Sequence, residues 1–135
     1  MQDYRNLIVY KEAYSLAHAI YELTKSWPSE ELYHLTIQIR RSAHSVDSNI
    51  CEGVSRNSFA DSLRFLYTAY ASLKETENHF RFAFDRGYVE KDVYLAYSAK
   101  IEILSKMLNN FISYFKKRSH LPKIPSSQDP SYESN

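Results

Sequence analysis

Apolar side chains recur every three or four residues in four long stretches of the chain, a spacing that predicts amphipathic helices. Polar and charged residues fill most of the positions between them. The predicted helices cover residues 6–26, 30–52, 58–85 and 91–117. Because the connections are short, neighbouring helices should run antiparallel. The pattern therefore predicts an all-α fold, an antiparallel up-down-up-down four-helix bundle.

Residues that start or stop helices lie at the ends of these stretches. Pro28 should end the first helix, because the residue before a proline avoids the α region. Ser29 and Ser58 are suited to cap the N-termini of the second and third helices. Gly53 and Gly87 are suited to close the same two helices at their C-termini.

The composition fits a few long helices in one domain. The chain has 135 residues with only two Gly and four Pro, whereas a β-sandwich or barrel needs many turn residues. Three of the four prolines fall in residues 119–135, among Ser, Gln, Asp and Asn. We therefore expect a bundle domain at residues 1–118 and a disordered tail at residues 119–135.

The single cysteine, Cys51, excludes an intrachain disulfide and any CxxC metal or redox motif. A reducing compartment is its simplest context. The first residues lack the basic start and apolar core of a secretory signal, and no apolar run approaches the ~18 residues of a membrane span. We expect a cytoplasmic protein with no membrane association.

The charge is nearly balanced, with 17 basic and 16 acidic residues. Residues 1–115 carry 13 basic and 14 acidic groups, and residues 116–135 carry four basic and two acidic groups. A nucleic-acid-binding domain is usually clearly basic. Binding of nucleic acid by this chain would therefore need a local patch, or an oligomer that gathers charge.

The second predicted helix carries a polar row beside its apolar stripe, centred about 100° from the stripe on a helical projection. The row consists of Gln38, Arg41, Ser42, Ser45, Asn49 and Glu52. It is either a solvated face or a seam against another helix or subunit. Ser and Asn are mediocre residues on a helix surface, which favours the seam.

Chain turns near residues 27–28 and 55 would set Asn49 and Glu52 level with the ends of the neighbouring helices. There an amide oxygen and a carboxylate could bind free N–H groups. We expect this structural role, with ligand or partner binding as the alternative.

Glu77 is the second unusual polar residue, because it falls within the apolar stripe of the third helix. A buried carboxylate needs a partner or a proton. The turn near residue 55 places Arg41 level with residue 69, about 12 Å from Glu77 along the axis. We therefore expect Glu77 to be buried and hydrogen-bonded to a group other than Arg41.

Residues 38–53 and Arg56 resemble the signature of the four-helix bundle proteins encoded in 23S rRNA intervening sequences. Residues 7–13 resemble that family's first helix, and residues 73–77 its third-helix motif. The resemblance covers about residues 4–115. The family is also similar to the accessory variability determinant of diversity-generating retroelements.

The resemblance implies a bacterial, cytoplasmic homo-oligomer, commonly a pentamer, with a suspected association with RNA or DNA and no known catalysis. Three positions depart from the family pattern. His34, within Tyr33-His34-Leu35, stands where relatives often have a glycine. Asp47 stands where many relatives have proline, which removes the reason to expect a helix kink there. Cys51 replaces a usual alanine.

Signals for catalysis or metal binding are weak. Glu31 and His34 form one Glu-x-x-His half of a di-iron motif, but Glu75 and His79 are four residues apart, the wrong offset for the other half. Two glycines are too few for a phosphate-binding loop. We predict no catalytic residues, no metal and no cofactor.

Two groups of cations are candidates for contacts with nucleic acid. The first is Arg40, Arg41 and Arg56, and the second is Lys116, Lys117, Arg118 and Lys123. The second group is the freer one, because Arg41 also belongs to the polar row. The 12 tyrosines favour a protein interface, with stacking on bases as the alternative.

These observations predict a non-catalytic, homo-oligomeric scaffold that associates with RNA, other nucleic acid or an RNA-handling partner. The alternative is a structural protein–protein interaction module with no affinity for nucleic acid.

Overall fold

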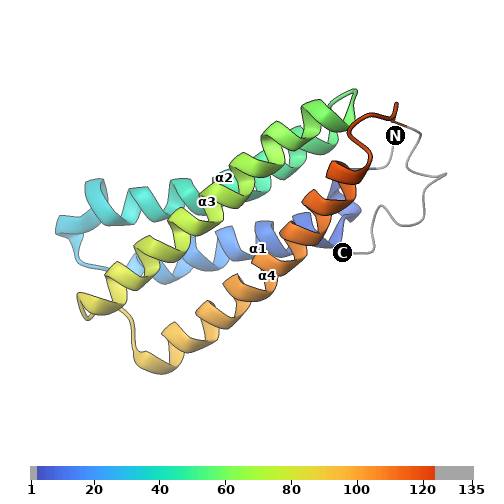
Figure 1. The fold of residues 1–135 in the computed structure, drawn as a ribbon. Helices are drawn as coiled ribbons and strands as arrows, with labels where there is room; N and C mark the ends of the chain where they lie inside the picture. The colour runs from blue at the N-terminus through green and yellow to red at the C-terminus, as the bar shows by residue number, and fades with distance from the viewer. Residues whose placement is uncertain (1–2, 124–135) are drawn as a thin grey trace.

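The computed structural model describes residues 3–123, which fold into four antiparallel helices (Figure 1). The helices are α1 Ile8–Leu23, α2 Ile37–Val54, α3 Phe59–Asp85 and α4 Lys91–Lys117. Within residues 3–123 no strand is present, apart from one isolated bridge between Ser58 and Pro122. The predicted all-α four-helix bundle is confirmed.

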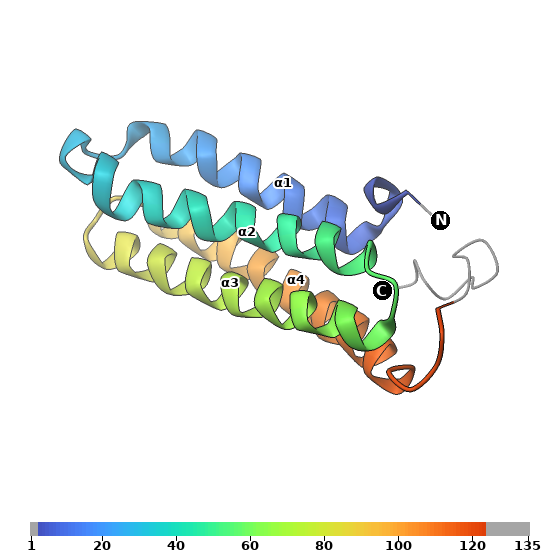
Figure 2. The same ribbon diagram turned by 90° about the horizontal axis from the view of Figure 1, so that it is seen from above.

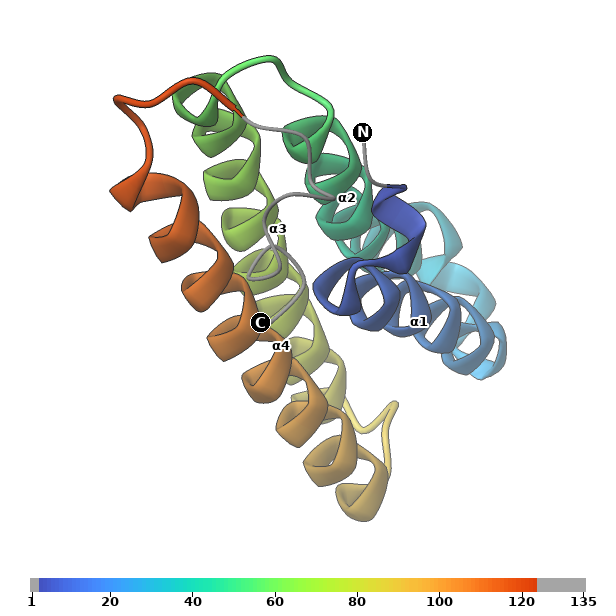
Figure 3. The same ribbon diagram turned by 90° about the vertical axis from the view of Figure 1, so that its right-hand side faces the viewer.

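The pair α2 and α3 forms the most extensive helix contact, and the two lie side by side along their length (Figures 2 and 3). α1 packs along α2, and α4 packs along α3. The core between them is built from fully buried aliphatic and aromatic side chains, with Phe80, Phe111 and Phe115 the largest.

The first interhelical connection is less regular than predicted. α1 gives way to a 3₁₀ turn, Thr24–Ser26, and Trp27 is extended with ψ of 156°, as the proline after it requires. The side chain of Ser29 makes no capping bond. A 3₁₀ turn, Ser29–Glu31, and a π-helical turn, Leu32–Thr36, precede α2 instead.

The two glycines have different roles. Gly87 has φ of +83°, and the N–H groups of Gly87 and Tyr88 bond to the Phe84 and Ala83 carbonyls, the pattern of a Schellman cap. Gly53, predicted as a cap, lies inside α2. A Cβ there would be 3.1 Å from Leu66 Cδ2, so Gly53 allows α2 and α3 to approach closely.

The first residues of the predicted tail contact the bundle. Residues 119–123 cross the α2–α3 turn, where Pro122 forms the bridge to Ser58. The Lys123 ammonium group donates to the carbonyl oxygens of Val54, at 3.3 Å, and Arg56. Residues 124–135, the remainder of the predicted tail, lie outside the described part of the chain.

Candidate functional site

Hydroxyl groups of α3 pack against one side of the polar row on α2. Thr76 Oγ1 lies 2.8 Å from both Ser42 Oγ and the Ser72 carbonyl oxygen, and Ser45 Oγ lies 2.9 Å from Ser72 Oγ. The Asn49 amide donates to Ser45 at the carbonyl, 2.8 Å, and at Oγ, 3.0 Å. We call these five residues the hydroxyl seam. Its polar groups are paired inside the chain.

The hydroxyl seam fixes the register of the α2–α3 hairpin. Ser45 lies level with Ser72. A turn centred at residue 55 would have placed Ser45 level with residue 65, seven positions earlier. α2 runs to Val54 and α3 begins at Phe59, so the turn lies later than position 55, which accounts for part of this offset. Asn49 therefore bonds within α2 rather than to the end of a neighbouring helix.

The prediction of a buried Glu77 is wrong. Its side chain is exposed and pairs with Lys74 on the same helix, at 3.7 Å. The residue buried between Leu73 and Phe80 is Thr76, one position earlier. One residue is about 100° of helix rotation, which is enough to turn Glu77 away from the core.

Other members of the polar row face solvent. Gln38, Arg41 and Glu52 are exposed. Glu52 pairs with Arg56, at 3.5 Å, instead of binding the N–H groups at a helix terminus as predicted.

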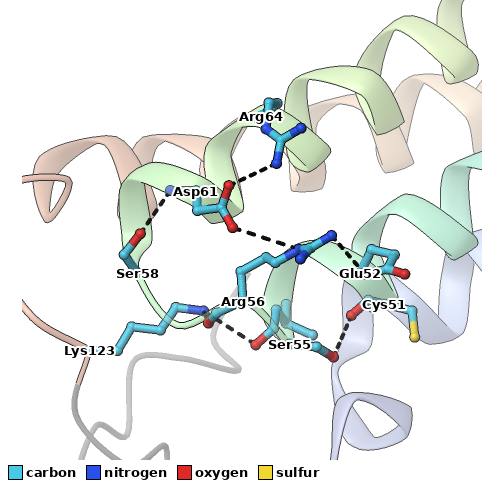
Figure 4. A network of polar contacts seen from close by, with 9 residues as sticks. Cys51, Glu52, Ser55, Arg56, Ser58, Asp61, Arg64 and Lys123 are labelled. Atoms are coloured by element: carbon cyan, nitrogen blue, oxygen red, sulfur yellow. Dashed lines mark hydrogen bonds and ion pairs between the residues drawn. The ribbon is translucent and has the colours of Figure 1, made fainter.

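A network at the α2–α3 turn holds two of the cations predicted to contact nucleic acid (Figure 4). Arg56 lies 3.7 Å from Asp61, and the Arg56 guanidinium stacks over Phe65. Asp61 also pairs with Arg64, at 2.9 Å. Lys123 satisfies carbonyls at the end of α2, and burial lowers the pKa of its ammonium group to about 8. Both cations are held in structural contacts.

The cations at the end of α4 are more open. Lys116 and Lys117 are exposed. Arg118 lies over the ring of its helix neighbour Tyr114, 3.7 Å from the centroid, and donates to the Tyr114 carbonyl.

A groove of about 1080 Å³ runs between α1 and α2, next to the hydroxyl seam. We call it the α1–α2 groove. Its lining consists of Tyr14, Ala17, His18, Tyr21, Glu22, Leu32, Tyr33, Ile37, Arg40, Arg41, His44, Ser45 and Ser48. Ser45 thus borders both the groove and the hydroxyl seam.

Aromatic rings line the α1 side of the groove in sequence. Tyr10 stacks on Tyr14 with centroids 5.5 Å apart, and Tyr14 meets His18 edge-on at 4.6 Å. One turn further on, the Arg40 guanidinium lies over the Tyr21 ring, 4.0 Å from its centroid. Arg40 Nε donates to Thr24 Oγ1, at 2.8 Å, so this arginine also ties α2 to the end of α1.

A family model described as 23S rRNA-intervening sequence protein matches residues 5–110. The matched segment contains the hydroxyl seam and all lining residues of the groove. The chain belongs to the 23S rRNA-intervening sequence protein family. Lys116, Lys117, Arg118 and Lys123 lie beyond the matched segment of this family.

One solved structure similar to this family member is a protein of unknown function from the S23 ribosomal protein family of Bacteroides thetaiotaomicron. It is 23% identical, with a TM-score of 0.70 over 78% of this chain and 98% of that one. At this identity the likeness supports the fold alone. No curated protein matches the chain.

Asp47 is buried in an unbroken α2. Its carboxylate lies 3.0 Å from Nδ1 of His44. Burial raises the pKa of Asp47, and the neighbouring His44 opposes that rise. Burial together with the Asp47 charge also raises the pKa of Tyr10 to about 12.

The sequence analysis did not predict the pair of Asp47 and His44, although the residue spacing indicates that Asp47 is buried. Asp47 is four residues after buried Ala43 and three before buried Ile50, so it lies on the apolar stripe. It fixes one ring nitrogen of His44 and leaves the imidazole at the edge of the groove.

Neither a metal cluster nor a membrane-crossing helix is found among residues 3–123. Glu31, half of the Glu-x-x-His pair, accepts a hydrogen bond from the Tyr88 hydroxyl at 2.7 Å.

Proposed function

We propose that this member of the 23S rRNA-intervening sequence protein family is a non-catalytic, homo-oligomeric, cytoplasmic scaffold that associates with nucleic acid. The observation that carries the proposal is the α1–α2 groove, where exposed tyrosines stand beside Arg41 and His44. Aromatic rings together with cations suit binding to a polyanion whose bases can stack. The family description, which names an rRNA element, agrees with that chemistry.

Self-association is supported by exposed apolar side chains on the other two helices. Phe82 on α3, with Leu95 and Ile103 on α4, are more than half exposed. Large exposed apolar residues mark interaction surfaces when they gather on one side of a molecule. The pentamer rests on the family resemblance and is part of the proposal.

An oligomer would also compensate for the balanced charge of one chain. A closed ring repeats each cationic group around one axis, so several weak contacts act together. Binding would then be electrostatic and strongly dependent on salt.

A second candidate function is a protein–protein interaction module without affinity for nucleic acid. It is favoured by the contacts of four predicted cations, because Arg40, Arg56, Arg118 and Lys123 are all engaged within the chain.

Two measurements on the purified full chain separate these functions. Native mass spectrometry at micromolar concentration should give a homo-oligomer, and a monomer would contradict self-association. A gel shift with single-stranded RNA at low salt should give a complex that added salt dissolves. An oligomer that shifts no RNA would favour the interaction module.

A further inference from the structure

We infer that the α1–α2 groove binds single-stranded nucleic acid, with unpaired bases on its exposed tyrosine rings and phosphates at Arg41 and His44. The inference rests on the proposed association with nucleic acid. It adds where the nucleic acid binds and that the bound nucleic acid is single-stranded. It stands on ring exposure, charge and fixed side-chain geometry.

The rings are open to a ligand. Tyr33 is 80% exposed, Tyr21 50% and Tyr14 44%, although all three line one groove. The π-helical turn, Leu32–Thr36, carries Tyr33 across from Tyr14 and Tyr21 on α1. Tyr33 offers a ring on which a base can stack, whereas Tyr14 already stacks on Tyr10 and Tyr21 lies under Arg40. A base in a duplex is already stacked and paired.

The accessible charge of the groove is positive. Among the lining residues the one carboxylate, Glu22, already pairs with Lys25 at 3.0 Å. Asp47, below the groove, is buried against His44. Arg41 and the outer edge of His44 remain exposed beside the rings. The Arg41 charge complements a phosphate backbone better than it complements a neutral apolar protein surface.

Two of the groups are held in place before any ligand binds. Asp47 holds the ring of His44, and Thr24 accepts from Arg40 Nε, with the Arg40 guanidinium 4.0 Å from the Tyr21 centroid. An arginine stacked on an aromatic ring extends the surface available to a base. Because these groups are already ordered, binding loses less conformational entropy.

The test measures fluorescence anisotropy of a labelled oligouridylate of about 12 nucleotides, a length within the range of single-strand sites. The same strand paired with oligoadenylate serves as the duplex probe. We expect the full chain to prefer the single strand. Tyr33→Ala and Tyr14→Ala should each weaken binding roughly 5- to 100-fold, the range for loss of one stacked base.

The cation is tested separately through salt dependence. Arg41→Gln should lower the slope of log affinity against log salt by about 0.7, the value for one lost phosphate contact on a single strand. Matched controls lie on α3: Tyr67→Ala, at a ring 48% exposed, and Arg81→Gln, at an exposed guanidinium. Both controls should bind like the unaltered chain.

Other results would overturn the inference in distinguishable ways. If the groove variants bind normally and Lys116→Gln with Lys117→Gln removes binding, the site is wrong and the proposed association stands. If the unaltered chain binds neither probe, the inference and the proposed association both fail. If Tyr33→Ala or Tyr14→Ala dissociates a homo-oligomer in native mass spectrometry, the groove is a contact between copies.

Discussion

The hydroxyl seam and the α1–α2 groove lie on two sides of the same helix, and they treat polar residues in opposite ways. In the seam, Ser42 and Ser45 meet hydroxyl groups of α3. In the groove, Arg41 and Tyr33 are left open. One helix therefore presents a polar face used for packing and a second face available for binding.

The difference shows that polarity alone does not identify a binding surface. Within the seam, the hydroxyl groups lose hydrogen bonds to water and form hydrogen bonds inside the chain. They therefore stabilise one helix register at little net cost in free energy. In the groove, exposed rings and cations contribute little to folding and can be replaced without loss of the core. Changes in the seam should lower stability, and changes in the groove should alter binding.

The largest expected effect on folding comes from Gly53, where α2 meets α3. Gly53→Val should lower the free energy of unfolding by about 2–3 kcal/mol, because its Cβ would stand 3.2 Å from the Ser62 carbonyl oxygen. Urea unfolding followed by the fluorescence of Trp27 measures this change. Unchanged stability would show that the two helices are free to separate.

A smaller loss should follow from breaking the hydroxyl seam. Thr76→Val keeps the shape and removes the hydroxyl that lies 2.8 Å from Ser42 Oγ, so it should cost about 1–2 kcal/mol. Ser42→Ala should cost less in this background than in the unaltered chain, because the contact between the two hydroxyl groups is already lost. Additive costs in this double-mutant cycle would contradict direct coupling across the seam.

Asp47 lies below the groove and should respond to pH with a defined sign. Because the folded-state pKa of Asp47 is raised above its ordinary value of 3.8, the folded chain holds the carboxyl proton more tightly than the unfolded chain does. The associated stability is present below pH 3.8 and is lost as pH rises through the folded pKa. Asp47→Asn should therefore become more stable than the unaltered chain as pH rises through that window. A pH-independent difference in urea unfolding would contradict this.

The groove tyrosines should have the smallest effect on folding. Tyr33→Ala should change the free energy of unfolding by less than about 0.5 kcal/mol, because the ring is 80% exposed. A loss as large as that of Thr76→Val would show that Tyr33 is part of the packing.

Much of the fold was predictable from the apolar spacing. The ranges predicted for the third and fourth helices differ from α3 and α4 by at most one residue. The side chain of Ser58 caps α3, as expected, by accepting from the Asp61 N–H at 3.1 Å. Such features depend on neighbours within one turn, which the sequence displays directly.

Features that depend on tertiary contacts were harder to predict. Glu77 was placed wrongly because the apolar stripe of α3 was assigned without knowledge of how α2 packs against it. Contact with α2 makes Thr76 the buried position. The π-helical turn, Leu32–Thr36, has no strong local signal. Likewise, Lys123 was assigned to a free tail because its acceptors, Val54 and Arg56, are far away in sequence.

For the candidate site, the sequence identified Arg40 and Arg41 but not the groove around them. The groove requires α1 and the turn before α2 to bring Tyr14, Tyr21 and Tyr33 together. No periodicity within one helix can show that arrangement. Tyrosine content alone therefore left an interface and base stacking as alternatives.

The central claim is that one polar face of α2 packs and the other binds. Hydrogen exchange of the full chain, with and without oligouridylate, tests it most directly. The account predicts slower exchange at residues 14–22 and 32–48 when the oligonucleotide is bound, with no change at residues 111–118. Protection confined to residues 111–118, with none along the groove, would contradict it.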